Sequence, residues 1–575
     1  MNILALSVGH DCGATILRDG MVAFAANEER FNRKKLTTGF PLKTVEYILD
    51  NIVSAENIDV VVFERKIQIG RVDFDYKQND TSYSAYSFLD KLNLARYLTG
   101  NPLMLKMLLP FLKLLFPSCS SEAKSILKEF KLNTKTVMLD HHFSHAAAGY
   151  FASGFDESLA ITIDGSGDGY CSKVYKAKNG KLTELHAIPM YHSLAIYYQY
   201  ITVLLGFTPN RHEGKVTGLA AYGDPDDALA KIFNERISYD SKSTRFVNHG
   251  YSYGREIAEL ERLLDGRSRE DLSRAIQDHV EKITYKYIDG IIKKHCPDQK
   301  NINLTVSGGL FANVKLNGLI STHPSIEKYF VFPHMGDGGN SYGASLGYYH
   351  GILDNPYTPN PIKTIYTGTD IGKDDALKAL KESGLEYSYE DDINEKVAQL
   401  LADGKVVARC SGPMEYGPRA LGNRSILYQG LDPAVNEWLN KKLEREEFMP
   451  FAPACMEEDA SEYFEGYSEK TAFTSKFMTL TYKTKEKFRK HAPAANHIDN
   501  TARPQVVSES DNPDYYEIIK RYRDITGYGA ILNTSFNVHE EPIVRTPSDA
   551  IKSFKHSKLD ALALDNYLVK IRKVD

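Results

Sequence analysis

Two histidines four residues apart are the first candidates for chemistry in this chain. His141 and His145 lie in the segment 140–148, which reads DHHFSHAAA and whose alanines favour a helix. Positions i and i+4 share one face of a helix, so both imidazoles can bind a single transition-metal ion. A helix that carries surface or capping histidines is the alternative interpretation of this segment.

Carboxylates embedded in glycine follow two expected strands. Asp164 begins the run 164–169 (DGSGDG) after a strand expected at 159–163, and Asp337 lies in the glycine-rich run 336–344. Strand ends within one α/β domain tend to share a cleft, so both carboxylates are expected beside the histidines. A site of imidazoles and carboxylates suits Fe²⁺, Mn²⁺ or Zn²⁺. Taken singly, each run is also an ordinary Gly/Asp turn.

Two more strand ends carry polar or glycine-rich turns. The N-terminal strand ends in Gly9-His10-Asp11, and a strand at 304–306 leads into Gly308, Gly309 and Asn313 before an expected helix. A glycine turn that opens a helix suits a nucleotide phosphate or ribose. Both turns are expected at the same cleft.

The C-terminal part holds candidate anion-binding side chains. Two arginines five positions apart lie among glycines in the segment 415–425, and 531–537 (ILNTSFN) leaves a strand with several hydrogen-bonding side chains. Arginine binds phosphate and carboxylate groups through paired hydrogen bonds. A capped turn is the alternative for 531–537. The candidates are Arg419, Arg424, Ser425, Lys442, Arg445, Arg503, Asn533, Thr534, Ser535 and Asn537.

Length and residue pattern predict an α/β protein of more than one domain. The chain has 575 residues, and strand-like runs alternate with helical ones along it. The proline-rich stretch 354–361 predicts a boundary between domains 1–355 and 364–575.

Composition narrows the functional class and the compartment. Hydrophobic content of 42% and charged content of 25% are typical of a soluble globular protein, and a formal charge of −5 gives no reason to expect a nucleic-acid partner. The six cysteines form no CxxC pair, which argues against a disulfide framework or a zinc ribbon. The N-terminus lacks the features of a signal peptide, so we expect a cytoplasmic protein.

The segment 92–116 departs from this pattern because it is both apolar and basic. Pro102 and Pro110 interrupt it and Pro117 follows it, it carries Lys106 and Lys113, and its apolar runs are too short to span a bilayer. Short core or lid helices are predicted, and the segment is a candidate for lining or covering an acceptor pocket. The alternative is a surface that touches a membrane or a lipid-linked substrate.

Taken together, the motifs carry a family resemblance over nearly the whole chain. The segments concerned are 9–11, 28–31 (EERF), 141–147 (HHFSHAA), 164–169, 213–223 (EGKVTGLAAYG), 307–313, 336–344, 414–425, 450–453 (PFAP), 532–537 and 541–544 (EPIV). The chain resembles the O-carbamoyltransferases of the nodulation-protein U type, which include enzymes that carbamoylate aminoglycoside and cephalosporin antibiotics.

The resemblance implies a fold and an activity for each domain. The first domain is expected to have the actin-like ATPase fold, and the second resembles domains that make threonylcarbamoyl-adenylate. The second domain would form carbamoyl-adenylate from ATP, with Mg²⁺, and carbamoyl phosphate. The first would pass the carbamoyl group to a hydroxyl of a small molecule or glycan.

The resemblance also implies roles for the candidate residues. His10 matches the catalytic histidine, and an imidazole titrates near about pH 6.5, as a base requires. The metal would be bound by His141, His145, Asp164 and Asp337, with Fe²⁺ expected and Mn²⁺ or Zn²⁺ as alternatives. Lys215, Gly308, Gly309 and Asn313 would contact the nucleotide, and the C-terminal set would bind carbamoyl phosphate and ATP.

Three positions depart from the pattern of the family. Met449 stands where many members have arginine, Leu443 where many have lysine, and Pro413 where arginine is common. These changes are expected to alter carbamoyl phosphate affinity without abolishing the chemistry. Two other functions are alternatives: a tRNA threonylcarbamoyl transferase, and a regulatory protein that binds nucleotide without turnover.

Overall fold

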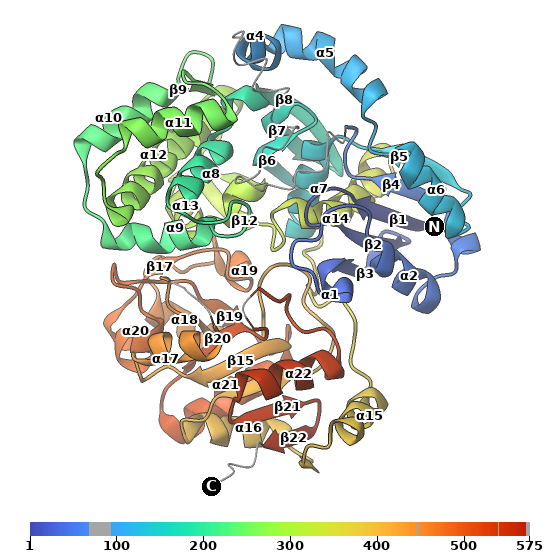
Figure 1. Cartoon of the computed structure of the whole chain (residues 1–575), viewed down its shortest axis with the longest axis vertical. Coiled ribbons are helices and arrows are strands. Elements are labelled where there is room, and N and C mark those ends of the chain that lie inside the picture. Colours follow the sequence, from blue (N-terminus) through green and yellow to red (C-terminus); the bar gives the residue numbers. More distant parts are fainter. Residues whose placement is uncertain (68–93, 445–447, 539, 571–575) are drawn as a thin grey trace. The chain divides into compact units, whose positions relative to one another are not determined.

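The computed structural model describes residues 1–67, 94–444, 448–538 and 540–570 as two units (Figure 1). Unit 1 comprises residues 1–23 and 38–362, and unit 2 comprises 24–37 and the chain from 363 onward. The units therefore separate at the end of the proline-rich stretch. Both contain sheets and helices, so the α/β class expected from the sequence is correct.

Unit 1 contains two sheets whose strands follow the same order. Among its described residues, one five-stranded sheet has the order β3-β2-β1-β4-β5 and the other has the order β8-β7-β6-β11-β12. In each, the first strand pairs antiparallel with the next strand in the chain and parallel with the fourth. The bounds are β1 Asn2–Ser7, β2 Gly13–Arg18, β3 Met21–Asn27, β4 Val60–Phe63, β5 Lys135–Met138, β6 Glu157–Gly167, β7 Tyr170–Lys178, β8 Lys181–Pro189, β11 Ile302–Ser307 and β12 Ile326–Val331.

Two helices join these sheets. α7 (His141–Ser153) packs on β6 and β11, α14 (Asn340–Leu346) packs on β1 and β2, and the two helices contact each other. Their backbones approach closely because Gly343 has no side chain: a Cβ there would lie 1.9 Å from the Ser144 carbonyl oxygen. The Asp140 carboxylate caps α7 by accepting a hydrogen bond from Phe143 N–H.

Unit 1 also contains one hairpin and, in its described residues, further α-helices. They are α2 Leu42–Asn51, α4 Leu94–Gly100, α5 Pro102–Leu115, α6 Ser121–Glu129, α8 Leu194–Leu204, α9 Glu213–Leu219, α10 Asp227–Arg236, β9 Ile237–Asp240, β10 Arg245–Asn248, α11 Tyr253–Leu263, α12 Arg269–His295 and α13 Val314–Ser321.

Helix α5 does not fit the prediction of a core helix. Of its side chains only Leu105 is buried, and most of the others are exposed. Apolar composition suggested burial, but the helix has more apolar side chains than its single contact face can cover. No helix in the described ranges is long and apolar enough to cross a membrane.

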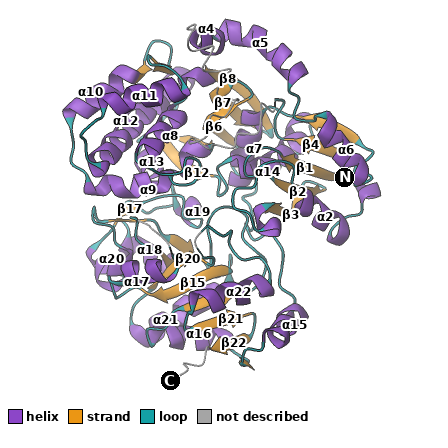
Figure 2. Ribbon diagram, viewed as in Figure 1, coloured by secondary structure: helices purple, strands orange, loops and turns teal. Residues whose placement is uncertain are grey.

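Unit 2 is built on one mixed sheet, which Figure 2 shows with its helices. In the described chain its eight strands run β13-β22-β21-β14-β15-β20-β16-β19, and α16 and α21 pack together over a core that includes Leu401, Leu427 and Ile519. The strands are β13 Tyr387–Tyr389, β14 Val407–Cys410, β15 Arg424–Gln429, β16 Ala452–Met456, β19 Gln505–Val507, β20 Ala530–Ser535, β21 Ala561–Leu564 and β22 Tyr567–Lys570, with the pair β17 Tyr482–Lys483 and β18 Thr501–Ala502 outside the sheet. The helices are α1 Glu29–Asn32, α15 Lys373–Ser383, α16 Ile393–Ala402, α17 Val435–Lys442, α18 Glu457–Tyr463, α19 Ala472–Ser475, α20 Glu486–His491, α21 Pro513–Thr526 and α22 Pro547–Ser557.

An early segment of the chain belongs to unit 2, whereas the sequence placed it in the domain 1–355. Residues 24–37 contain the EERF motif, and two arginines hold them in unit 2. Arg30 donates to the Gly417 carbonyl, and Arg33 donates to the carbonyls of Pro542 and Ile543. These long-range hydrogen bonds leave no periodicity in the sequence, which explains why the segment was grouped with its neighbours in the chain.

Candidate metal centre

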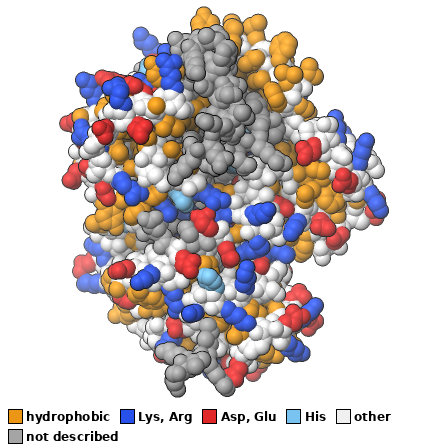
Figure 3. All heavy atoms as spheres, in the orientation of Figure 1, with side chains coloured by type: hydrophobic (Ala, Val, Ile, Leu, Met, Phe, Trp, Pro, Cys, Tyr) orange, Lys and Arg blue, Asp and Glu red, His pale blue; other side chains and the backbone are white. Residues whose placement is uncertain are grey.

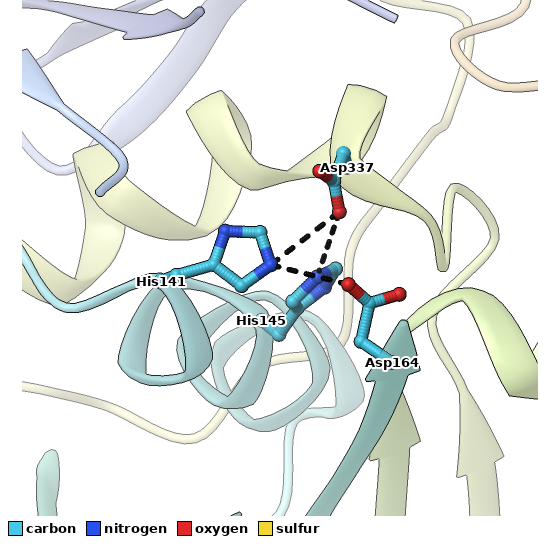
Figure 4. A group of neighbouring side chains, drawn as sticks. All are labelled: His141, His145, Asp164 and Asp337. Atoms are coloured by element: carbon cyan, nitrogen blue, oxygen red, sulfur yellow. Dashed lines mark hydrogen bonds and ion pairs between the residues drawn. The ribbon is translucent and has the colours of Figure 1, made fainter. Parts of the chain in front are cut away.

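Four side chains from three parts of unit 1 converge on one point (Figure 4). His141 and His145 come from the first turns of α7, Asp164 from β6, and Asp337 from the short turn before α14. One ligand atom from each residue lies within 4.8 Å of the others. The structure therefore brings together all four residues of the predicted metal site.

Burial and unmet hydrogen-bonding capacity make this cluster suitable for a cation. Both imidazoles are fully buried, and the two carboxylates are nearly so. His145 Nε2 and Asp337 Oδ1 face each other at 3.4 Å, yet neither has a hydrogen-bond partner among the described residues. Buried polar atoms normally have partners, and a metal ion between them would supply one.

Neighbouring groups orient the ligands. The Ser307 hydroxyl donates its hydrogen to the Met335 carbonyl and lies 3.2 Å from His145 Nδ1, so it accepts from Nδ1–H and leaves the lone pair of Nε2 directed at the cluster. A Cβ on Gly167 would lie 1.9 Å from Cδ2 of His141, so only glycine leaves room for that ring.

Arg65 holds the carboxylate of Asp337 from the other side. Its Nη2 donates to Asp337 Oδ2 at 2.7 Å, and its Nε donates to the buried carboxylate of Glu64 at 2.7 Å. Sequence reasoning missed both residues. They directly follow the strand at 60–63, so the rule that found the other strand-end groups could have found them too.

Charge sets the protonation of the cluster in the absence of an ion. Burial, the largest single effect, would lower the pKa of His141, but the charge of Asp337 together with hydrogen bonds to Asp164 and Asp337 raises that pKa to about 10. Burial would raise the pKa of Asp337, but His141 and Arg65 hold it well below its usual range. For His145, burial dominates and lowers the pKa. The site therefore favours one positive charge beside two carboxylates.

His10 lies at the edge of this cluster. Its Nδ1 is 3.8 Å from Asp337 Oδ2, and its side chain is 39% exposed whereas the metal-site histidines are buried. An imidazole in this position can reach a substrate that approaches from solvent.

The predicted nucleotide-binding turn connects directly to the cluster. Gly309 N–H donates to Asp164 Oδ1 at 2.8 Å, and Gly308 has a φ of 108°, a value that favours glycine. Asn313 caps α13 and pairs its amide with Gln277 of α12, so its side chain supports the turn. Lys215 is buried on α9, with its Nζ 5.7 Å from the Phe207 ring.

In unit 2 the strand register gathers part of the predicted anion-binding set. β15 and β20 pair so that Ser425 lies opposite Ser535, and Thr534 and Asn533 follow on β20. The Asn533 amide donates to the Ala420 carbonyl, which ties β20 to the loop that contains Arg419. Ser425 Oγ accepts from Gly422 N–H in the same loop.

Arg424 has a different role from the one expected. Its side chain is fully buried, and its guanidinium donates to the carbonyls of Ser411, Gly412, Asn423 and Thr369. A guanidinium held by four carbonyls stabilises the loop and is not available to bind phosphate. The sequence could not distinguish this role, because buried and ligand-binding arginines occur in similar glycine-rich surroundings.

The other predicted residues are more dispersed. Arg419 is half-buried in its loop, Lys442 ends α17, Arg503 lies between β18 and β19, and the Asn537 amide donates to the carbonyls of Val538 and Glu541. Arg445 lies outside the described residues. Leu443, which stands where the family often has lysine, is fully buried.

The loop 415–424 is organised around a carboxylate that sequence reasoning did not select. Oε1 of Glu415 accepts hydrogen bonds from the backbone N–H groups of Leu421, Asn423 and Arg424. Since Glu415 is buried, these bonds fix the path of the loop. Glu415 belongs to the motif 414–425, and an acidic residue among the predicted arginines was the available signal.

The chain thus combines two units with different candidate sites. Unit 1 carries a buried His/Asp cluster, and unit 2 carries a loop with arginines. Residues 2–346 match the family described as "Carbamoyltransferase N-terminus", and residues 398–571 match "Carbamoyltransferase C-terminus". The chain belongs to the carbamoyltransferase family, and the protein is a carbamoyltransferase enzyme.

Named relatives are similar over most of their length. Nodulation protein NolNO of Sinorhizobium fredii is 31% identical over 98% of this chain and 79% of its own, and nodulation protein NolO of Bradyrhizobium diazoefficiens is 32% identical over 76% and 79%. A Methanocaldococcus jannaschii protein, MJ1051, is 33% identical over 99% of both chains.

Likeness to solved structures is weaker. The crystal structure of T. kodakarensis HypF is matched over 60% of this chain and 47% of its own, with 11% identity and a TM-score of 0.33. A likeness at that level does not define a shared fold.

Proposed function

We propose that this carbamoyltransferase activates its carbamoyl group with ATP before transferring it to a hydroxyl. The observation that carries the proposal is the buried His/Asp cluster beside a glycine turn, which Gly309 connects to the cluster through Asp164. A nucleotide phosphate at this turn would lie next to the metal ligands. Membership of the carbamoyltransferase family supplies the group that is transferred.

In the proposed first step, unit 2 makes the activated carbamoyl group. Water hydrolyses carbamoyl phosphate to carbamate and phosphate, and the carbamate oxygen attacks the α-phosphorus of Mg²⁺-bound ATP. Pyrophosphate leaves, and carbamoyl-adenylate is formed. Arg419 is the arginine of the loop 415–424 that we assign to phosphate binding, with Ser425, Thr534 and Ser535 as hydrogen-bonding partners.

In the proposed second step, unit 1 transfers the group. The acceptor oxygen attacks the carbamoyl carbon, the bond to the adenylate oxygen breaks, and AMP leaves with its phosphate intact. His10 would take the proton of the acceptor hydroxyl, since its exposed imidazole lies beside the cluster. Because Gly308 and Gly309 have no side chains, the adenylate could approach the protein backbone closely at this turn.

The four ligands suit a transition metal, with Fe²⁺ favoured and Mn²⁺ or Zn²⁺ as alternatives. Bound there, a metal ion would supply a Lewis acid for the adenylate phosphate, an effect worth several kcal/mol. Arg65 would hold Asp337 in place for it. The actin-like fold proposed for unit 1 is supported by its two sheets of the same strand order, and the acceptor is proposed to be a small molecule or a glycan.

The test is the release of AMP and pyrophosphate from ATP by the purified protein, with and without carbamoyl phosphate and without any acceptor. Pyrophosphate release that requires carbamoyl phosphate is expected, because adenylate formation precedes transfer. Transfer of carbamoyl from carbamoyl phosphate to an acceptor without any ATP consumption would contradict the proposal.

A further inference from the structure

Helix α5 presents an apolar stripe to solvent. Leu103, Met107, Phe111 and Leu114 are 68%, 62%, 66% and 79% exposed. Their spacing of three and four residues places them on one face of the helix. Figure 3 shows hydrophobic side chains gathered where Figure 1 places α5. Large exposed apolar patches on a folded protein usually mark a contact with a partner or a membrane.

The opposite face of α5 holds the helix on unit 1. Leu105 is fully buried, and a Cβ on Gly169 would lie 2.8 Å from Leu109 Cδ2 and 3.2 Å from Leu105 Cδ1. The helix also has its own start signals, because Pro102 is its first residue and the Asn101 side chain accepts from Leu103 N–H and Met104 N–H. The stripe therefore lies on a helix that has its own N-terminal sequence signals and packs against unit 1.

Only positive charge accompanies the stripe. Lys106 and Lys113 lie seven residues apart and are exposed, and they share one flank of α5 because seven residues are close to two helical turns. From 94 to 121 the sequence contains no aspartate or glutamate, and Arg96 adds a further positive charge. Lysine stems can lie along an apolar surface while their ammonium groups reach anionic headgroups.

The charge pattern also favours an anionic bilayer over a second copy of the chain as the partner of the stripe. If two copies of α5 packed stripe to stripe, each helix would bring lysines and no carboxylate to the pair, so their charges would repel. An anionic bilayer offers an apolar layer and a negative surface together. The helix is far too short to cross a bilayer and would lie in its interface.

We propose that α5 is a membrane-surface anchor that binds reversibly to anionic bilayers. The stripe enters the boundary between headgroups and acyl chains, and Lys106 and Lys113 contact lipid phosphates. Since Gly169 lies in the turn between β7 and β6, the strand that carries Asp164, binding would hold the candidate metal centre near the membrane surface.

The test is flotation of the full-length protein with vesicles of phosphatidylcholine alone or mixed with phosphatidylglycerol. The wild-type protein is expected to float with the mixed vesicles, and added salt is expected to weaken this binding. The triple variant Met107→Ser, Phe111→Ser, Leu114→Ser should bind about tenfold more weakly or worse, because three buried apolar contacts are lost. Lys106→Glu with Lys113→Glu should remove the preference for anionic lipid.

A matched control distinguishes the stripe from exposed apolar residues in general. Leu42, Ile498 and Ile525 are 46%, 61% and 44% exposed and lie outside α5, so their triple serine variant should float like wild type. Unchanged binding by the α5 variant, or no binding of the wild-type protein to anionic vesicles, would overturn the proposal. A concentration-dependent dimer that the α5 variant abolishes, without vesicle binding, would assign the stripe to a second copy and overturn it as well.

Discussion

Arg65 and Asp337 form a buried ion pair in which the arginine occupies one oxygen of the carboxylate and leaves the other facing His141 and His145. Nη2 of Arg65 lies 2.7 Å from Oδ2, while Oδ1 lies 3.4 Å from the nearest nitrogens of His141 and His145. The two oxygens of one carboxylate thus have separate tasks. The arginine fixes the direction in which Asp337 can bind a cation.

Replacing this arginine tests its positioning role. Arg65→Met should weaken metal binding by about 10–100-fold, because Asp337 loses the group that orients it. Arg65→Lys should restore part of the affinity, since it keeps the charge but not the paired donors. Metal affinity measured by competition with a chelator checks this. Arg18→Met, at an exposed arginine, is the control, and equal affinities in all variants would contradict the role.

His10 provides a test that separates the two proposed steps. His10→Ala should slow carbamoyl transfer by about 10²–10⁴-fold, because the acceptor hydroxyl loses its base. Pyrophosphate release that depends on carbamoyl phosphate should remain, since that step is assigned to unit 2. Both products are measured in the same reaction, with metal content checked.

The control for this variant is His556→Ala, at an exposed histidine of unit 2. It should leave both rates unchanged. If His10→Ala stopped pyrophosphate release and transfer equally while the metal was retained, His10 would not be the base of the second step alone.

The side chains that converge in the candidate metal centre could be predicted to meet because each carries a local pattern. The i, i+4 spacing of His141 and His145 and the glycines around Asp164 and Asp337 are visible in the sequence. Arg65 and Ser307 are positioned by other residues. Buried Glu64 orients Arg65 by accepting from its Nε, and the Met335 carbonyl orients Ser307 by accepting from its hydroxyl. Such contacts depend on the packing of distant strands, so the sequence could place Arg65 at a strand end but could not show that it holds Asp337.

Arg424 and Arg419 are expected to respond differently to substitution. Arg424→Met removes the hydrogen bonds of the guanidinium to the part-buried carbonyls of Ser411 and Gly412 and to the carbonyl of Thr369. Each is worth about 1–3 kcal/mol, so unit 2 should unfold at a clearly lower temperature. Arg419→Ala should keep the stability and reduce pyrophosphate release. Calorimetry with the activity assay checks both.

The structural role assigned to Arg424 and the ligand-binding role assigned to Arg419 can both be contradicted by experiment. An Arg424→Met protein with unchanged thermal stability and lost activity would return Arg424 to the ligand-binding set. Arg424→Lys serves as the conservative comparison, because its ammonium can reach some but not all of the four carbonyls.

Fold class was predictable from strand and helix periodicity, but membership of the units was not. Runs such as 60–63 and 304–306 are strands because β-branched and apolar residues fill them. Residues 24–37 join unit 2 through Arg30 and Arg33, whose partners lie hundreds of positions away. Helix α5 shows the converse: its composition predicted burial, but nothing among the described residues covers its outer face.

Glu213 should make stability depend on pH. Burial raises the pKa of Glu213 to about 7, although Asn210 N–H donates to its carboxylate. The folded protein therefore keeps this proton while the unfolded chain, with a pKa near about 4.3, loses it. Stability should fall as pH rises between these values and level off above the folded pKa.

The measurement is the melting temperature of wild type and Glu213→Gln across this pH range. The amide cannot ionise and still accepts from Asn210 N–H, so the difference between the two proteins should grow in favour of the variant as pH rises. Parallel curves would show that Glu213 does not carry the effect.

The most direct test of the account is the metal content of the purified protein, measured by mass spectrometry after supply of Fe²⁺, Mn²⁺ and Zn²⁺ in turn. We expect one tightly bound transition-metal ion per wild-type chain, its loss in His145→Ala and Asp337→Asn, and its retention in His556→Ala. A wild-type protein that binds none of the three ions, or folded variants that retain the ion with unchanged affinity, would contradict the metal centre.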